Sequence, residues 1–388
     1  MRIVQFANFY APTSGGLRTF VEETGRGYTA RGHSRVLVVP GLIDGDEWTD
    51  AGRKVTIASP PMFGSDEYRR VRARRRVLGL LDAVAPDVLE INDKMAVTWL
   101  SAWARRRGVP TVLVSHERID AILKSRVPGL AAGASWHSRL PLIPAANAVN
   151  RALRRRVDRV VVASAFSAAE FERAGVRDVE HIPLGVDLAT FRPQQTDEER
   201  HEVELVLVSR LSMEKSPELA IATLRRLRSL DLPVRLTVIG DGPLRAHLQA
   251  LAAVPERAGS QDGLPVRFLG HVADRHRLAG LIAAADIAVC PSSAETFGLA
   301  TLEALACGTP VVVPTHGALH ELVPQPKAGV VCAPTAEDFA AGVRALLAVA
   351  PDVRRAAARA VALAYPWERT VSELLALHSL LSAAAAYR

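Results

Sequence analysis

Two glutamates stand at positions 295 and 303 of the stretch PSSAETFGLATLEALACGTPVV, which covers residues 291–312. The apolar run DIAVC before them predicts a buried strand, and the residues after Gly298 predict a helix. Backbone N–H groups at a helix start bind anions, and a glycine there lets a ligand approach closely. Both carboxylates can accept hydrogen bonds from sugar hydroxyls. The alternative is structural: Glu295 as a favourable N-terminal helix acid and Glu303 as a solvated helix residue.

A basic pair follows another apolar run, ELVLVS, in the segment VSRLSMEKSPELAI. Arg210 can give a forked pair of charge-assisted hydrogen bonds to phosphate, and Lys215 adds a mobile positive charge. As ordinary loop charges these residues would need no ligand. However, a cation near a helix N-terminus is electrostatically disfavoured, so the position of Lys215 favours phosphate binding.

Other candidates carry weaker signals. Gly15 and Gly16 lie between the first expected strand and helix, where a plain tight turn is the alternative to ligand binding. His116 ends the apolar run PTVLVSH, so it belongs at the carboxyl edge of a sheet, either facing a ligand or as a structural histidine. The D-x-D of residues 44–46 predicts a turn, because no other acidic cluster surrounds it. Gly240–Gly242, followed by a proline, predicts a turn between strand and helix.

The chain that must position these residues alternates apolar strands with amphipathic helices. This rhythm predicts parallel sheets with helices on both faces, and it restarts after a polar segment. We therefore expect an α/β fold of two doubly wound, Rossmann-like domains facing a cleft, because open α/β sheets bind ligands at the carboxyl ends of their strands. The expected parts are an acceptor-binding domain over 1–187, a linker over 188–202, a nucleotide-binding domain over 203–365, and a tail over about 366–388 that crosses back to the first domain.

Composition narrows the class of protein. The 388 residues are 49% hydrophobic and 23% charged, as in an ordinary globular protein, and long enough for two domains. The net charge of +7 lies wholly in residues 1–200, which hold 30 Lys and Arg against 23 Asp and Glu. A basic protein that binds nucleic acid without catalysis is thus one alternative. The aromatic content of only 5% and the neutral second half argue against it, so no nucleic-acid partner is expected.

The sequence also gives expectations about compartment and metals. The start lacks the pattern of a signal peptide, and no apolar run reaches the length of a membrane span, so we expect a cytoplasmic protein. Cys290, Cys307 and Cys332 are odd in number and lie in apolar or Gly/Pro-flanked runs, which indicates buried reduced thiols. The spacings C-x-x-C and H-E-x-x-H do not occur, so no metal site is expected.

Taken together these motifs resemble the family-4 retaining glycosyltransferases, which have the GT-B fold. The resemblance covers almost the whole chain, and its specificity comes from the set and order of the motifs. They are GG-L at 15–17, His116, HIPLGVDLATFRP at 181–193, SRLSMEK at 209–215, VIGDGP at 238–243, VRFLGHV at 266–272 and the two glutamates at 295 and 303. One departure is Leu184, where the family more often has asparagine, and we expect it to affect loop packing.

The resemblance implies a role for each matching residue. It assigns diphosphate binding to Arg210 and Lys215, contact with the transferred sugar to His116, and the donor sugar hydroxyls to Glu295. The remaining donor-binding positions that it implies are Gly16 near the diphosphate, the backbone of Val272 at the base, the amides of Phe297, Gly298 and Leu299 at sugar and phosphate, and Glu303 at the ribose.

These roles agree with the chemistry of sugar transfer from a diphosphate. The transition state is oxocarbenium-like, and negative charge grows on the leaving group. Arg210, Lys215 and the helix start at 297–299 would stabilise that charge in place of a metal or other cofactor. No carboxylate nucleophile is evident, so the retention of configuration that the resemblance implies favours front-face attack, with the leaving phosphate oxygen taking the acceptor proton.

Donor and acceptor are less defined. Guanine presents N1–H and N2–H2 donors that a carboxylate can accept, and Asp274 stands two residues after Val272. Similar mannosyltransferases use GDP-mannose, which we therefore favour over a UDP-sugar. The acceptor could be a carbohydrate, a lipid-linked molecule or a small molecule. The run YRRVRARRRVLGLL mixes apolar residues with arginines and could lie on an anionic membrane or help to bind the acceptor, or it could be a solvated basic helix. Its arginines are Arg69, Arg70, Arg72, Arg74, Arg75 and Arg76.

Overall fold

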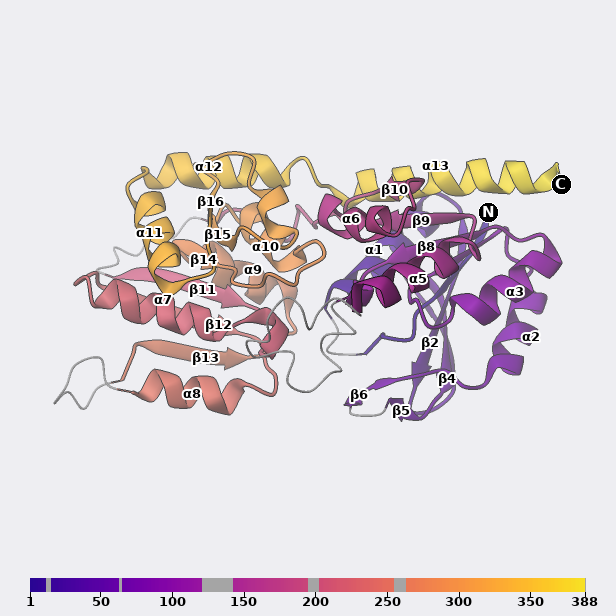
Figure 1. The fold of residues 1–388 in the computed structure, drawn as a ribbon, viewed down its shortest axis with the longest axis horizontal. Coiled ribbons are helices and arrows are strands. Elements are labelled where there is room, and N and C mark those ends of the chain that lie inside the picture. Colours follow the sequence, from indigo (N-terminus) through magenta and orange to yellow (C-terminus); the bar gives the residue numbers. More distant parts are fainter. Residues whose placement is uncertain (12–14, 63–64, 121–141, 195–201, 255–262, 388) are drawn as a thin grey trace. The chain divides into compact units, whose positions relative to one another are not determined.

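The computed structural model describes residues 1–11, 15–62, 65–120, 142–194, 202–254 and 263–387 (Figure 1). The chain forms two compact units, one of Met1–Leu184 with the segment from Trp367 onward, the other of Gly185–Pro366. The unit boundary thus falls after residue 184, three residues before the boundary that the sequence indicated. Residues 195–201 of the expected linker lie outside the described residues. Each unit is built on a largely or wholly parallel sheet, so the expected α/β class is confirmed.

The sheet of the first unit has eight strands among the described residues, in the order β10-β9-β8-β7-β1-β2-β4-β3. Its pairings are parallel except for the antiparallel edge pair of β3 and β4. The strands are β1 (Arg2–Phe6), β2 (Ser34–Gly41), β3 (Gly45–Thr49), β4 (Gly52–Ala58), β7 (Val88–Ile91), β8 (Thr111–Ser115), β9 (Arg159–Val162) and β10 (Val179–His181); β5 (Pro61–Met62) and β6 (Ser65–Arg69) form a separate ribbon. Central strands such as β7 and β8 are buried along their whole length, as parallel strands covered on both faces must be.

Helices cover both faces of this sheet. They are α1 (Gly16–Ala30), α2 (Arg74–Val84), α3 (Val97–Arg107), α5 (Leu142–Arg154), α6 (Ala165–Arg173) and the C-terminal α13 (Trp367–Ala386). Helices α2 and α3 bury Val77, Leu81 and Trp103 in one core with alternate strand residues. On the other face α13 packs closely on α1, because a Cβ at Gly27 would lie 2.4 Å from a methyl carbon of Val371. The C-terminal helix therefore completes the first unit.

The second unit has the strand order β13-β12-β11-β14-β15-β16, with every pairing parallel. This is the doubly wound order of a Rossmann-like sheet, whose direction of winding reverses between β11 and β14. The strands are β11 (Val203–Val208), β12 (Val234–Ile239), β13 (Val266–Gly270), β14 (Ile287–Val289), β15 (Val311–Pro314) and β16 (Gly329–Cys332). The helices are α7 (Glu218–Arg228), α8 (Arg245–Ala253), α9 (Arg275–Ala283), α10 (Leu299–Ala306), α11 (Ala336–Leu347) and α12 (Pro351–Ala362), with short 3-10 helices η2 (Met213–Lys215) and η3 (Leu319–Leu322).

One local prediction was wrong. Residues 44–46 do not form a turn: Asp46 lies in β3, where it forms an ion pair with Arg53 across the β3–β4 hairpin. Asp44 accepts the backbone N–H of Ala58 at 2.8 Å and forms a 2.5 Å ion pair with Arg76 of α2. Both carboxylates thus help to hold the edge of the sheet, because each lies opposite a positive charge from a neighbouring element.

The three cysteines are free thiols, but only Cys307 is buried, while Cys290 and Cys332 are half-buried. The expectation of three buried thiols was therefore correct for one residue. Desolvation still raises the pKa of Cys290 and Cys307 to about 12 and that of Cys332 to about 11. Within the described part of the chain, no helix has both the length and the apolar character needed to cross a membrane.

Candidate active site

The reversal point of the second sheet brings two predicted residues together. Lys215 lies in η2 after β11, and Glu295 lies in the loop after β14, 80 residues further along the chain. The two strands are neighbours, and the Lys215 Nζ lies 2.7 Å from Glu295 Oε1. Their side chains are 24% and 28% exposed, so a ligand can reach both groups. The pair stands where doubly wound sheets bind ligands.

Hydrogen bonds between the two loops hold this pair in place. The Ser292 hydroxyl, after β14, donates to the backbone oxygen of Glu214 in η2 at 3.0 Å. The Ser212 hydroxyl donates to the Glu214 carboxylate at 2.6 Å, which fixes the start of η2. On its other side, Glu295 accepts the backbone N–H of Ala318 through its own backbone oxygen at 3.0 Å. The backbone of Glu295 is thus held by loop contacts while its side chain meets Lys215.

Helix α10 begins directly after this loop. Gly298 has a φ of +97°, a conformation that favours glycine, and it lets the chain turn into the helix. Among the described residues no side chain caps this helix start, so the backbone amides at Leu299 are open to an anion. Phe297 is buried and makes an edge contact with Tyr365, which anchors the turn.

Glu303, one turn into α10, is only 8% exposed, so the reading of this residue as a solvated helix acid was wrong. Its carboxylate lies 3.9 Å from the guanidinium of Arg275 at the start of α9. Arg275 also stacks over the Phe191 ring at 5.1 Å. The Glu303 carboxylate is therefore held between α9 and α10, near the carboxyl edge of the sheet where Glu295 also lies.

The remaining predicted residues of the second unit lie on the same edge. Arg210 follows β11 and is exposed. Val272 and Asp274 follow β13, half-buried and exposed respectively. Asp274 also caps α9, because its Oδ1 accepts the backbone N–H groups of His276 and Arg277 at 2.9 and 3.2 Å. Any ligand contact by Asp274 would thus be made by a carboxylate already oriented by the helix.

The first unit carries the other two predicted residues. Gly16 begins α1 after β1, and a Cβ placed there would meet no described atom within 4 Å. His116 directly follows β8, with its Nε2 3.0 Å from Asn92 Oδ1 and its ring 4.9 Å from that of Phe20. Burial lowers the pKa of His116 from 6.5 to about 3, and the positive charge of Lys94 contributes to this lowering. The imidazole is therefore neutral at physiological pH.

Known families match both units. Residues 14–190 match the family described as Glycosyltransferase Family 4, and residues 202–349 match Glycosyl transferases group 1. A GDP-mannose-dependent alpha-(1-6)-phosphatidylinositol dimannoside mannosyltransferase of Mycobacterium tuberculosis is 37% identical over 384 residues, 97% of this chain and 95% of the relative. This chain belongs to glycosyltransferase family 4. A glycogen synthase of the same species is 32% identical over 399 residues, 95% of this chain and 92% of that one.

Solved structures agree with the GT-B fold of this glycosyltransferase. Sucrose-phosphate synthase from Thermosynechococcus elongatus has a TM-score of 0.77 at 21% identity and covers 99% of both chains. Anabaena HepE in complex with UDP and glucose has a TM-score of 0.72 at 20% identity, covering 97% of this chain and 98% of its own. The glycosyltransferase is thus a nucleotide-sugar-dependent hexosyltransferase, and the alternative of a non-catalytic nucleic-acid-binding protein is set aside.

Sequence reasoning missed two charged residues of the glycosyltransferase near His116. Lys94 follows β7, and Glu170 lies in α6; both side chains are buried, and they form a 3.3 Å ion pair. A signal for Lys94 was present, because the polar triplet of residues 92–94 directly follows the apolar strand β7, at the same sheet edge as His116. Glu170 gave no such signal, since it looks like any acid on an amphipathic helix.

The arginine run of residues 69–76 lies on the first unit. Arg69 ends β6, and its guanidinium donates to the backbone oxygen of Ser59. Val71, Val77 and Leu81 of this region belong to the core, so they are not available to insert into lipid, while Leu78 and Leu80 are partly buried against that core. The exposed arginines are Arg72, Arg74, Arg75 and Arg76, while Arg69 and Arg70 are half-buried.

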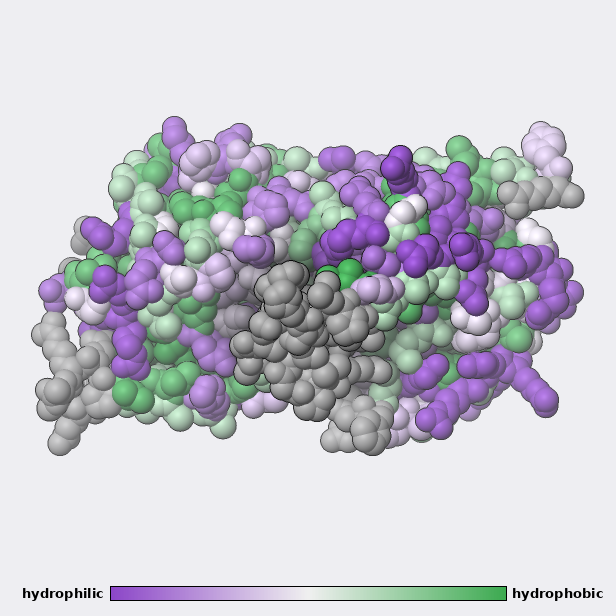
Figure 2. Space-filling model, viewed as in Figure 1, coloured by the Kyte–Doolittle hydropathy of each residue, from purple (hydrophilic) through white to green (hydrophobic). Residues whose placement is uncertain are grey.

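A second basic surface lies elsewhere on this unit. Figure 2 shows hydrophilic side chains gathered over α5 and α6, the region that includes the arginines of residues 151–159.

Within the residues that the structure describes, no group of three His, Cys, Asp or Glu side chains is placed to hold a metal ion.

Proposed function

We propose that this glycosyltransferase moves mannose from GDP-mannose to a hydroxyl of a lipid-linked acceptor. The observation that carries the transfer is the convergence of Lys215 and Glu295, 2.7 Å apart, beside the uncapped start of α10. A cation and helix amides suit a diphosphate, and a carboxylate suits sugar hydroxyls. Support for donor and acceptor comes from the 37% identical relative, which is described as acting with GDP-mannose on phosphatidylinositol dimannoside.

The proposed roles follow from this arrangement. Arg210, Lys215 and the amides of residues 297–299 hold the diphosphate, Glu295 holds the mannose hydroxyls, and Glu303 holds the ribose. In the transfer, the bond from the sugar anomeric carbon to the phosphate oxygen breaks, and a bond to the acceptor oxygen forms on the same face. The acceptor proton passes to the leaving phosphate oxygen, so configuration is retained. The preorganised positive groups stabilise the charge that grows on the diphosphate, without a metal.

In the first unit, Gly16 and His116 serve the diphosphate and the transferred sugar. A neutral imidazole suits this role, because it can donate from one ring nitrogen and accept at the other. An imidazolium would add a positive charge beside an oxocarbenium-like sugar and would oppose the reaction. The low pKa of His116 therefore supports its place near the anomeric centre.

Base selection is the part of the proposal that separates GDP-mannose from a UDP-sugar. Guanine would place its N1–H and N2–H2 donors toward Asp274, whose orientation is fixed by its helix cap. Isothermal titration calorimetry with GDP and UDP tests this. We expect GDP to bind at least tenfold more tightly, which is about 1.4 kcal/mol. If UDP binds more tightly than GDP, the proposed donor is wrong, and a UDP-sugar is the donor instead.

Turnover tests the transfer itself. The enzyme is supplied with GDP-mannose alone and then with phosphatidylinositol mannosides in detergent micelles, and GDP release and labelled lipid are measured. We expect slow GDP release without acceptor and a large increase with it. Release that is unaffected by every mannolipid, but increased by a soluble sugar, would assign a carbohydrate or small-molecule acceptor instead.

A lipid acceptor would bring the first unit to a membrane, and the exposed arginines at the start of α2 supply the matching charge. Because Val77 and Leu81 of α2 are buried and its other large apolar residues are partly buried against the core, we propose that this contact is mainly electrostatic. Leu42, Ile43 and Trp48 of the neighbouring β2–β3 region are exposed and could add shallow apolar contacts; the Asp44–Arg76 ion pair links that region to α2.

Co-sedimentation with vesicles tests the membrane contact. Vesicles with anionic phosphatidylinositol should bind the enzyme, and zwitterionic vesicles should not, with binding lost at high salt. The variant R72Q/R74Q/R75Q should lose binding. The matched control is R105Q/R106Q/R107Q, which removes three exposed arginines from the end of α3 in the same unit. Equal loss in both variants, or indifference to lipid charge, would contradict a specific membrane surface on α2.

A further inference from the structure

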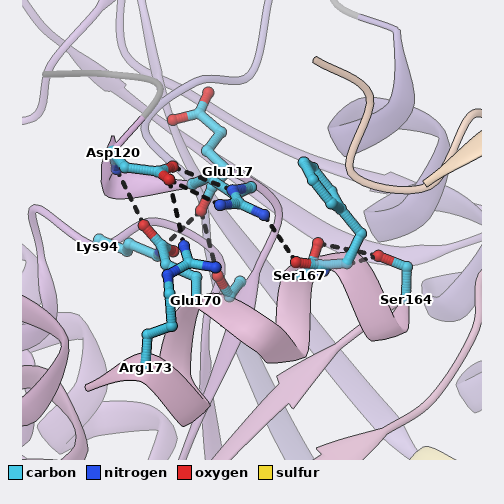
Figure 3. A network of polar contacts seen from close by, with 10 residues as sticks. Lys94, Glu117, Asp120, Ser164, Ser167, Glu170 and Arg173 are labelled. Carbon is cyan, nitrogen blue, oxygen red and sulfur yellow. Dashed lines mark hydrogen bonds and ion pairs between the residues drawn. The ribbon is translucent and has the colours of Figure 1, made fainter. Parts of the chain in front are cut away.

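A network of polar contacts includes Glu117 and Asp120, which lie on the loop that follows His116 (Figure 3). It joins the loop after β7, the loop after β8 and helix α6. Ion pairs join Lys94, Arg118 and Arg173 to Asp120 and Glu170, while Glu117 takes part through its backbone oxygen. Its charged members are Lys94, Arg118 and Arg173, and Glu117, Asp120 and Glu170.

Lys94 is at the centre of this network, and its side chain is only 9% exposed. Its ammonium lies 3.3 Å from Glu170 Oε2 and donates to the backbone oxygen of Glu117 at 2.5 Å. It also lies 5.2 Å from the centre of the Phe171 ring. These partners come from the loop after β8 and from α6, so the ammonium is held inside the protein by both.

Glu170 holds the same loop from its other end. Its side chain is 2% exposed, and its Oε1 accepts the backbone N–H of Asp120 at 2.9 Å. The Asp120 carboxylate forms ion pairs with Arg118 at 2.7 Å and with Arg173 at 3.3 Å. The guanidinium of Arg118 donates to the backbone oxygen of Phe166 at 2.8 Å, and its central carbon lies 4.0 Å from the centre of the Phe166 ring. The loop after His116 is therefore fixed at residues 117, 118 and 120.

We propose that the buried Lys94–Glu170 ion pair is the positioning device for His116: it holds the 117–120 loop at both ends and so sets the place of the imidazole. This inference rests on the proposed role of His116 in sugar transfer. Neither residue touches the substrate in this assignment; both act through His116.

The energetics support a positioning role over a stabilising one. A buried ion pair costs desolvation that its attraction only partly offsets, and an apolar replacement of the whole pair is often no less stable. What an apolar pair could not do is bond to the backbone at Glu117 and Asp120, which lie one and four residues after the imidazole. The pair thus specifies a loop conformation.

Lys94 also affects the charge state of His116. Desolvation and the Lys94 charge both lower the pKa of the imidazole. The other charged groups of the network are Glu117, Arg118 and Asp120 on the loop after His116 and Glu170 and Arg173 on α6. From α1, the uncharged ring of Phe20 packs against the imidazole. Removal of Lys94 together with Glu170 takes away one charge of each sign and leaves neither partner of the pair buried alone.

The test uses the double variant K94M/E170Q in the full-length enzyme. The side-chain oxygen of the introduced glutamine can still accept the Asp120 N–H, so the variant loses the Lys94 contacts and the charges alone. The matched control is K54M/E47Q, which makes the same two changes in a 2.6 Å Lys–Glu pair on the exposed β3–β4 hairpin. The readouts are the His116 pKa by NMR, with the H116N variant assigning the signal, and kcat and KM for GDP-mannose.

We expect kcat to fall about tenfold or more in K94M/E170Q with little change in donor KM. The His116 pKa should rise, because the Lys94 charge is gone, but it should stay below 6.5, because desolvation, the larger cause of its lowering, remains. The control should match the wild type in both. An unchanged His116 pKa together with unchanged kcat in a folded double variant would overturn the proposal. If K94M/E170Q does not fold, K94Q/E170Q, whose amides can bond to each other, is measured in its place. Failure of both to fold would assign the pair to stability and also overturn the proposal. The proposed function fails separately, if H116N itself transfers mannose normally.

Discussion

The variant Lys215→Met tests whether the Lys215–Glu295 pair matters for the rate of transfer or for the stability of the fold. In the folded protein both side chains are about a quarter exposed, so water screens their attraction. A pair of this kind contributes at most about 1 kcal/mol to stability. For a unit of this size, a loss of ~1 kcal/mol lowers the melting temperature by roughly 2–4 °C. The stability effect of Lys215→Met should therefore be small.

The effect on transfer should be much larger. In the proposed transfer, the same ammonium meets the charge that grows on the diphosphate in the transition state, in a site where loop contacts already hold its position. Loss of one such preorganised group costs about 10²-fold in rate, or ~2.7 kcal/mol. We thus expect kcat/KM for GDP-mannose to fall about 10²-fold while the protein remains folded.

The assay is GDP release, measured together with a thermal unfolding scan. The control is Lys54→Met, which removes the ammonium of a similarly short Lys–Glu pair far from the site in sequence. Glu295→Gln should also lose about 10²-fold, and the double variant should lose less than the product of the two single losses, because both groups act on one transition state. Turnover of Lys215→Met within about threefold of the wild type, or additive losses in the double variant, would refute the reasoning.

Further predictions concern a turn, a titration and the thiols. Gly298→Ala places an alanine at a φ of +97° and beside a packed side chain, so it should cost more stability in urea unfolding than Gly32→Ala, at +76° in open space; equal costs would contradict the close packing. Folding lowers the His116 pKa from 6.5 to about 3, so the protein loses stability as pH falls from 6.5 toward 3, where the unfolded chain binds the proton more readily. The urea midpoint of H116N should therefore fall less between about pH 7 and 4.5 than that of the wild type. Parallel curves for the two proteins would argue against a buried neutral imidazole. Cys290 and Cys307, with pKa values near 12, should react with iodoacetamide at neutral pH far more slowly than free cysteine, as measured by mass spectrometry, and rapid labelling of the folded enzyme would show that these thiols are not desolvated.

The fold was predictable because its signals are local. Central strands such as β8 and β11 are apolar runs with a polar residue at or directly after their carboxyl end, and parallel strands must end on one edge. Lys215 and Glu295 could thus be placed on the same edge from the sequence alone. Their contact at 2.7 Å could not, because it depends on β11 pairing directly with β14.

The missed features have physical reasons. The β3–β4 hairpin carries charged residues such as Asp46 and Arg53 in place of an alternating apolar pattern, since it closes an exposed edge where ion pairs replace burial. Glu170 was missed because its partner is 76 residues away, and only tertiary structure turns a helix acid into half of a buried pair. Sequence periodicity reports which face of a helix is buried, but it does not report which polar group will meet its counterpart there.

The two sheets place their candidate residues by the same rule. In each, the winding direction reverses between two neighbouring strands, β1 and β7 in the first and β11 and β14 in the second. Helices leave the sheet on opposite faces at that point, so the loops separate and side chains at the strand ends remain accessible. In the first sheet this edge holds Gly16 and, beside β7, Lys94, which contacts the loop after His116; in the second it holds Lys215 and Glu295. The difference lies in charge. At the first edge the imidazole of His116 is uncharged at neutral pH, which suits the proposed contact with the transferred sugar, whereas the second edge carries Lys215 and the exposed Arg210, which suit the proposed contact with a diphosphate.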